Sequence, residues 1–158
     1  QNGIPDDLEH YDEKIEDIEL SLRDLISHKL DSSAELDSYQ EYVPQHLKDK
    51  AELKIKKWIS KNPGEEKSQF LAFRRKLDFF DFQEYFELIS AKSVWPLFEE
   101  TFVNKANLQS RFNQLGELRN SIRHSRGVTE IAIKDGEAAL SWFNSILKSS
   151  TIKSIELE

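Results

Sequence analysis

The residues with the clearest chemical potential in this chain stand close together at Arg119, Asn120 and His124. A histidine exchanges protons near neutral pH, and an arginine presents a planar, permanently charged guanidinium to phosphate oxygens. An asparagine can orient the histidine or a phosphate by hydrogen bonding. With Arg123 and Arg126 beside the trio, the segment predicts a cationic group that meets a phosphate and moves protons at it.

Arg119 is unusual because it interrupts an apolar helical stripe. Leu108, Phe112, Leu115 and Ile122 recur at the spacing of one helix face, and Arg119 lies within roughly 40° of Leu115 on that helix. A buried guanidinium without a partner is very costly, so this position requires an anion or access to water. A phosphate, a carboxylate from a neighbouring helix, or a side chain that reaches out at the edge of the stripe would each meet the requirement.

The end of this helix decides which side chains share a face. Arg119 and His124 are five residues apart, about 140° on an unbroken helix, whereas Asn120 and His124 are four apart and can touch. Gly127 is placed to end the helix in a left-handed conformation. Residues 111–126 hold four arginines and one acid, a local charge of +3 in a chain of net charge −7.

The motif and its flanks resemble HEPN domains, many of which cleave RNA. The flanks that carry the resemblance are Asp78–Tyr85, Trp95–Phe98 and Leu115–Asn120. They look most like the HEPN subgroup found at the C-terminus of nuclear RNA-quality-control endonucleases and of prokaryotic defence proteins. The resemblance covers the chain from about Tyr39 to Ser149, and it implies an all-helical domain that is part of a larger protein.

The resemblance also implies an activity and an assembly. It implies an endoribonuclease that cleaves single-stranded RNA without a metal or another cofactor and leaves 2′,3′-cyclic phosphate ends. Because HEPN domains pair, it implies a homodimer in which two motifs face each other and form one composite site. Gly116, one turn before the motif, would allow the two helices to approach closely. The implied roles are catalytic for Arg119, Asn120 and His124, and substrate-binding for Arg123 and Arg126.

Two other interpretations stay open. HEPN-like bundles include members that dimerise or bind RNA without cleaving it, and a fold does not determine a function. An intact Arg-Asn and His favour catalysis, whereas the weak positive charge of the body favours a non-catalytic module. A plain helical scaffold follows if Arg119 is salt-bridged inside a monomer.

A second Arg…His pair in the chain is rejected on its context. Arg23 and His28 fit a relaxed form of the motif with Asp24 in second place. They flank a heptad seam instead of interrupting it; the seam consists of Leu8, Tyr11, Ile15, Ile18, Leu22 and Leu25. Residues 1–37 also hold twelve acids and three bases, a charge of −9 that would repel a phosphate chain.

Composition excludes several classes of protein. The chain has no cysteine, and its four histidines lack the spacing of a helical metal site, so we expect neither a zinc enzyme nor a bound cofactor. No apolar run approaches about 18 residues, so we expect no membrane partner. Methionine is absent even at position 1, which indicates a piece of a larger protein. We expect a cytoplasmic location, or a nuclear one in a eukaryote.

Charge and periodicity divide the chain into three parts. Residues 1–37 are an acidic amphipathic helix, from about Asp6 to Leu30, with a following loop; residues 38–150 are the helical bundle; residues 151–158 are a tail. The heptad seam of the first helix indicates a helix partner, either in the same bundle or in a second copy. We expect an all-α bundle of five to seven helices.

Local signals set the expected boundaries. Helices are expected from Pro44 to about Lys61, from about Glu65 to Leu77, from Asp81 to about Ala91, from Ser93, from an Asn107 cap, and from Glu137 to Leu147. Asp81 and Glu84 form a capping pair. Thr129–Ile133 and Thr151–Glu158 alternate as extended chain does.

The aromatic residues offer a second place for RNA. Most of them have the packing period of a core, but Phe70 and Phe73 stand beside Arg74, Arg75 and Lys76. Aromatic rings next to cations can stack on single-stranded bases. Arg74 and Arg75 are therefore candidate substrate-binding residues, against the common alternative that a basic run is a solvated face.

Overall fold

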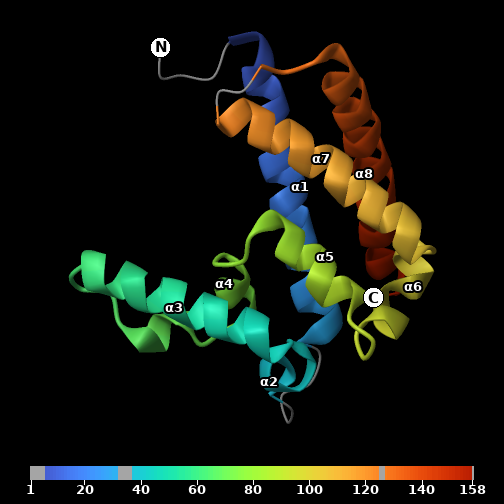
Figure 1. Ribbon diagram of the computed structural model, residues 1–158. Helices are drawn as coiled ribbons and strands as arrows, with labels where there is room; N and C mark the ends of the chain where they lie inside the picture. The colour runs from blue at the N-terminus through green and yellow to red at the C-terminus, as the bar shows by residue number, and fades with distance from the viewer. Residues whose placement is uncertain (1–5, 32–36, 125–126, 158) are drawn as a thin grey trace. The chain divides into compact units, whose positions relative to one another are not determined.

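The computed structural model describes residues 6–31, 37–124 and 127–157, and the regular secondary structure in this part of the chain is all helical (Figure 1). Its elements, in order, are α1 Asp6–Leu30, α2 Ser38–Tyr42, α3 Gln45–Lys61, the 3₁₀ turn η1 Lys67–Phe70, α4 Phe73–Leu77, α5 Phe82–Ser90, α6 Trp95–Phe102, α7 Lys105–Arg123 and α8 Glu130–Leu157. The prediction of an all-α fold with a long N-terminal helix is confirmed. No helix among the described residues combines the length and apolarity required to cross a membrane.

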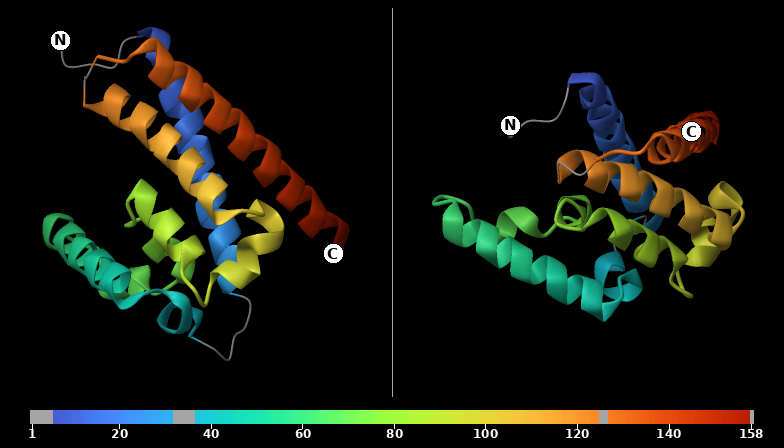
Figure 2. Two further views of the ribbon diagram at one scale, coloured as in Figure 1. Left: turned by 45° about the vertical axis from the view of Figure 1, so that its right-hand side comes forward. Right: turned by 45° about the horizontal axis from the view of Figure 1, so that its top comes forward.

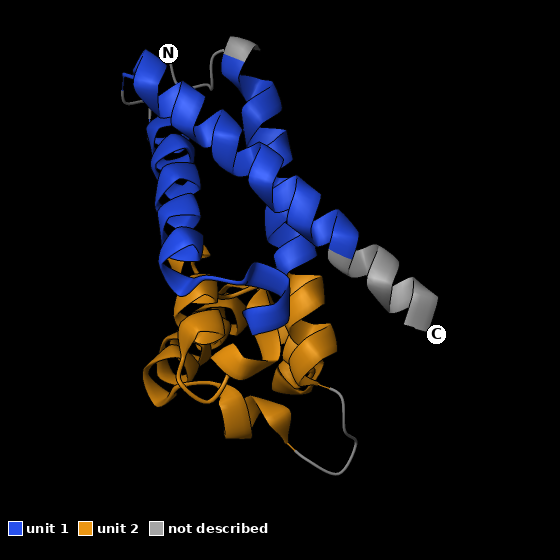
Figure 3. Cartoon of the chain, turned by 90° about the vertical axis from the view of Figure 1, so that its right-hand side faces the viewer, with its two compact units in different colours: residues 1–22, 99–158 blue, residues 23–98 orange. Residues whose placement is uncertain are grey.

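The chain forms two compact units, which Figure 3 shows in different colours. Unit 1 comprises residues 1–22 and 99–158, and unit 2 comprises residues 23–98. The boundaries between the units fall within α1 and within α6. Each unit buries apolar side chains of its own.

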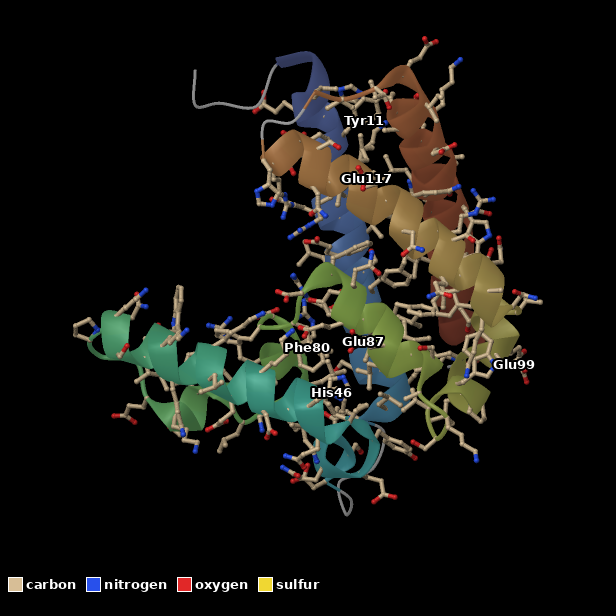
Figure 4. All side chains as sticks on the ribbon, in the orientation of Figure 1. Tyr11, His46, Phe80, Glu87, Glu99 and Glu117 are labelled. Carbon is tan, nitrogen blue, oxygen red and sulfur yellow. The ribbon has the colours of Figure 1, made fainter. Side chains whose placement is uncertain are left out.

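In unit 1, α7 and α8 lie side by side, as the views of Figures 1 and 2 agree. Phe112 of α7 and Phe143 of α8 are both fully buried and meet edge to face with ring centroids 5.3 Å apart. Tyr11 of α1, labelled in Figure 4, interacts with Glu137 of α8; burial and this carboxylate raise the pKa of the Tyr11 hydroxyl.

The seam of α1 is buried inside its own chain. Ile15, Ile18 and Leu22 are at most 1% exposed, and the buried positions continue at Ile26 and Leu30. The buried apolar positions after Ile18 are therefore spaced by four, and Leu25 of the seam is only half-buried, so the buried stripe turns gradually around the helix instead of following the heptad. Of the two partners left open by the sequence, the structure places α1 in its own bundle.

In unit 2, short helices pack around a core that includes Phe70, Leu77 and Tyr85. The expected capping pair at the start of α5 is present, because Asp81 and Glu84 each accept from the other's backbone N–H. His46 of α3 and Glu87 of α5, labelled in Figure 4, are hydrogen-bonded, with Nε2 and Oε2 2.9 Å apart.

Several expected boundaries were wrong. The segment from Glu65 to Leu77 is not one helix: it divides into η1 and α4 at Leu71, and Glu66 and Gln69 form a capping box at the start of η1. The N-cap of α7 is Asn104, whose side chain accepts the N–H of Asn107, so the expected cap was three residues late.

The C-terminal part of the chain also differs from expectation. Thr129 precedes a helix: its hydroxyl accepts the N–H of Ala132, and one helix, α8, then runs from Glu130 to Leu157. Residues 130–133 and 151–157, which were expected to be extended, belong to this helix. Gly136 also lies within it. Gly127 has no left-handed φ, and α7 ends at Arg123 with His124 as its C-cap. Alternation over five to eight residues did not separate a strand from an amphipathic helix.

Gly136 allows α8 to approach α7 closely. A Cβ added there would lie 2.9 Å from Cβ of Leu118, whose side chain is fully buried. Overpacking at such a contact outweighs the helix propensity gained with alanine. We therefore expect Gly136→Ala to lower the free energy of unfolding by about 1–2 kcal/mol in urea. Gly127→Ala, whose Cβ would meet nothing within 4 Å, is the control and should change it by less than about 0.5 kcal/mol. Equal effects of the two variants would contradict the close approach.

Candidate functional site

The motif Arg119-Asn120…His124 occupies the last turns of α7. The helix ends where the backbone N–H of His124 donates to the carbonyl of Asn120 at 2.9 Å. Asn120 and His124 are exposed, while Ser121 and Ile122 between them are buried. The end of the helix thus presents an amide and an imidazole to solvent at the i, i+4 spacing that allows them to meet.

Arg119 is held by an acid of its own chain. Its Nε donates to Oε1 of Glu19 in α1 at 2.7 Å, and the two side chains are 26% and 8% exposed. The anion that the apolar stripe requires is therefore a carboxylate from a neighbouring helix. The terminal Nη atoms of Arg119 make no hydrogen bond to any described residue. The guanidinium of Arg119 is thus anchored through Nε, and its Nη donors have no partner among the described residues.

Arg123 is held in the same way. Its Nε donates to Oδ1 of Asp12 at 2.8 Å, and one Nη lies 3.7 Å from the carboxylate of Glu16. Asp12 pairs with the later arginine and Glu19 with the earlier one, so α1 and α7 run antiparallel along this contact. Acids of the N-terminal helix, which were expected to repel a phosphate chain, thus form ion pairs with the arginines of α7.

Two further expectations concern this helix. Gly116 is buried within its own chain, so it does not offer a second copy the close approach expected of it. Arg126 lies outside the described residues. Glu117, labelled in Figure 4, is exposed on α7 and stands two residues before Arg119, about 200° away around the helix. Glu117 is therefore not the ion-pair partner of Arg119, which is Glu19 of α1.

The candidate arginines of unit 2 belong to an ion-pair network. Arg74 donates to Asp24 at 2.8 Å and to Asp78 at 2.7 Å, and Arg75 donates to the other oxygen of Asp78 at 2.8 Å. Burial raises the pKa of Asp78, but the hydrogen bonds from Arg75 and Arg74 outweigh it and hold this pKa below its ordinary value. Arg23 also lies 3.9 Å from Asp78, so three guanidinium groups surround one carboxylate.

The second Arg…His pair has a structural arginine. Nε of Arg23 donates to the hydroxyl of Tyr85 at 2.6 Å, and that hydroxyl donates to the carbonyl of Leu77 at 2.8 Å. Tyr85 is fully buried, so these bonds satisfy a polar group within the core of unit 2. His28 is exposed.

The expected RNA-facing phenylalanines are buried. Phe70 and Phe73 are 1% and 4% exposed, so neither can stack on a base, and that expectation was wrong. Arg75 lies over the rings of Phe70 and Phe79, with its guanidinium carbon 4.9 and 5.8 Å from their centroids. An aromatic side chain of unit 2 that does reach solvent is Trp58 of α3, which is 43% exposed.

Unit 2 also has a polar hollow of about 310 Å³ between α2, α3 and the segment after it. The hollow is lined by Tyr39, Gln40, Gln45, Lys48, Asp49, Glu52, Lys67 and Lys76. Glu52 pairs with Lys67 at 3.0 Å, and burial together with Glu52 raises the pKa of Tyr39 to about 12. The Tyr39 hydroxyl thus stays neutral, and the ammonium of Lys76 lies 4.3 Å from the centre of its ring.

Among the described residues, no three His, Asp or Glu side chains come together in a way that could hold a metal ion. Comparison of the chain with protein-family models, with curated proteins and with solved structures finds no match. The candidate site therefore depends on the residues and geometry given above.

Glu19→Ala tests the ion pair that holds the motif. It would leave Arg119 partly buried without its anion, so we expect the free energy of unfolding in urea to fall by about 2 kcal/mol. Glu16→Ala is the matched control, because Glu16 is 60% exposed and 3.7 Å from its arginine; its effect should stay below about 0.5 kcal/mol. A Glu19→Ala protein as stable as the Glu16→Ala protein would refute the ion pair's structural role.

Asp78→Asn tests the network of unit 2. Because the folded pKa of Asp78 is lowered, its charge stabilises the fold above the ordinary aspartate pKa of about 4, and that contribution is lost as the pH falls through the folded pKa. We expect the variant to be about 2 kcal/mol less stable at pH 7, with the difference shrinking as the pH falls below about 4. Asp49→Asn, at an exposed residue that accepts only from Gln45 among the described residues, should change little. A pH-independent effect of Asp78→Asn would argue against the charge pairing.

Proposed function

We propose that this chain is a metal-independent endoribonuclease domain of a larger protein, which cleaves single-stranded RNA to 2′,3′-cyclic phosphate ends. The observation that carries the proposal is that the last turns of α7 hold, within six residues, a guanidinium anchored by Glu19 together with exposed Asn120 and His124. An anchored guanidinium keeps a fixed direction, which is what stabilisation of a developing charge requires. The resemblance to HEPN domains supports the same activity.

The reaction needs two proton transfers. The 2′-hydroxyl oxygen attacks phosphorus while a base takes its proton, the bond from phosphorus to the 5′-oxygen breaks, and an acid gives that oxygen a proton. His124 suits either step, and the Nη donors of Arg119 suit the negative oxygens on phosphorus. Asn120 is placed to hold the phosphate or orient the imidazole.

One motif supplies one histidine, and the reaction is easier with a separate acid and base. We therefore include in the proposal a homodimer in which two α7 ends face one RNA, so that each copy contributes His124. In this arrangement one imidazole accepts the proton of the 2′-hydroxyl, and the other protonates the leaving oxygen.

A non-catalytic helical module is the second candidate. The observation that favours it is the pairing of both described motif arginines with acids of the same chain, which lowers the net positive charge at the end of α7. The pairing of Arg119 with Glu19 of the same chain is also the arrangement expected of a plain helical scaffold. Under either alternative, Arg119 and Arg123 serve mainly to attach α7 to α1.

His124→Ala separates the two candidates. The variant removes an exposed side chain, so we expect an unchanged fold and a fall of at least about 100-fold in cleavage of labelled single-stranded RNA in EDTA. His28→Ala, at an exposed histidine of the second Arg…His pair, should leave cleavage intact. The combined variant Glu19→Gln with Arg119→Ala removes both charges of the pair and should also be inactive without leaving an unpaired buried acid.

Cleavage that stops in EDTA, or products that end in a simple 3′-hydroxyl, would contradict the mechanism. A wild-type chain that is folded and dimeric but cleaves no RNA would favour the non-catalytic module. Equal activity of the wild-type and His124→Ala proteins would remove the site from α7.

A further inference from the structure

Unit 2 concentrates positive charge in one stretch of chain. Residues 45–76, which contain α3, η1 and α4, hold ten Lys and Arg and four Asp and Glu, a charge of +6. Residues 23–98 as a whole hold thirteen of each sign and are neutral. The basic residues are therefore gathered on a few elements of unit 2 and are balanced elsewhere.

The lysines of α3 divide into paired and unpaired groups. Lys50 and Lys54, towards the start of the helix, bind Glu84 and Asp81 at 2.8 and 2.7 Å. Lys57 and Lys61, in its last turns, are exposed and form no ion pair with any described residue. Lys56 is likewise exposed and has no ion pair with a described residue, so three unpaired lysines lie in the C-terminal half of α3.

Trp58 lies between these unpaired lysines in sequence and is about 60° from Lys61 around α3. Its indole is 43% exposed and is held by an edge contact with Phe79, with ring centroids 6.4 Å apart. Arg75, which belongs to α4, lies over the Phe79 ring, and the Arg75 side chain is 42% exposed. A large aromatic ring is thus fixed at the surface with cations around it.

We propose that Trp58, Lys57, Lys61 and Arg75 form a binding surface for single-stranded RNA. A base stacks on the exposed indole, and the neighbouring phosphates contact the two lysines and the guanidinium. Unpaired bases have free faces for stacking, whereas the bases of a duplex are already stacked on each other. The choice of RNA over DNA rests on the proposed function; the choice of a single-stranded polyanion rests on this surface.

A protein partner fits the surface less well. The centre of a protein interface is depleted of charged residues, and lysine is among the depleted types. Here the exposed aromatic ring is accompanied by ammonium groups without acid partners, which would have to be desolvated or paired by the partner. A polyanion supplies one phosphate per nucleotide and meets that requirement directly.

The experiment measures binding of the full chain carrying His124→Ala, so that RNA is not consumed, to a fluorescent 20-nucleotide single-stranded RNA by anisotropy. Trp58→Ala should weaken binding by about tenfold, and Trp58→Phe should recover most of that loss because a ring is restored. Lys57→Gln with Lys61→Gln should weaken binding and reduce the slope of log Kd against log salt by about 1.4, since each phosphate that is no longer neutralised lowers the slope by about 0.7.

The matched control is Lys92→Gln with Lys148→Gln, which removes the same charge at two exposed lysines elsewhere. It should leave the salt slope unchanged. A duplex RNA of the same length should bind more weakly than the single strand, and a DNA strand of the same sequence no more tightly than the RNA. Circular dichroism confirms that each variant is folded.

Three results would overturn the inference: no binding of single-stranded RNA at low salt, equal Kd values for the Trp58→Ala and control proteins, or tighter binding of the duplex. The first would leave the surface to a partner of another class. Failure of this inference can be distinguished from failure of the proposed function. Binding is measured on the His124→Ala chain, and cleavage is measured separately on the wild type.

Discussion

The ion pair between Glu19 and Arg119 is the interaction on which the arrangement of unit 1 depends. A carboxylate that is 8% exposed cannot remain charged at low cost without a partner, and neither can a guanidinium on an apolar helix face. In the ion pair, each charge offsets the free-energy cost of burying the other charge. Their contact, with the second pair at Asp12 and Arg123, aligns α1 with α7 and places the end of α7 relative to the rest of the unit. The acidic N-terminal helix is therefore part of the unit that holds the candidate site.

The same physical rule separates structural charges from available ones throughout the chain. Arg23, Arg74 and Arg75 gather around Asp78, and Lys50 and Lys54 meet acids at the start of α5. The exposed lysines late in α3, which are Lys56, Lys57 and Lys61, are among the charges that have no ion pair with a described residue. A basic sequence is thus a weak guide to a binding surface until its acid partners are known, and here those partners select a smaller set of cations.

Much of the fold follows from local signals. The bounds of α1, the start of α3 after Pro44 and the capping box of α5 were all predicted from spacing and cap residues, because neighbours in sequence determine them. The anomaly of Arg119 was also visible. Its partner was not, because Glu19 is 100 residues away and only packing of α1 on α7 brings the two together. One signal was available: Glu19 lies on the seam of α1, between Ile15 and Leu22, where a charge needs a partner as much as Arg119 does.

The errors had a common physical cause. Phe70 and Phe73 were candidates for an RNA-facing strip and are buried, since the sequence does not reveal which face of a short helix is covered. Likewise α8 is longer than expected, because residues 129–133 alternate in polarity and Gly136 resembles a helix boundary. The close contact of Gly136 with Leu118 explains the glycine by packing, and such a contact has no signature in the sequence alone.

The proposed function requires Arg119 to be anchored through Nε, as its contact with Glu19 indicates, and to have its Nη donors available for a phosphate. The most direct measurement is the arginine side-chain region of a ¹H–¹⁵N NMR spectrum of the His124→Ala chain, recorded with and without single-stranded RNA. The account predicts a resolved, slowly exchanging Nε–H resonance for Arg119 that is lost in Glu19→Gln, stays in place when RNA is added, and is accompanied by shifts of the Nη resonances. An Nε–H that exchanges freely, or RNA that leaves the Nη resonances of Arg119 unchanged, would contradict it.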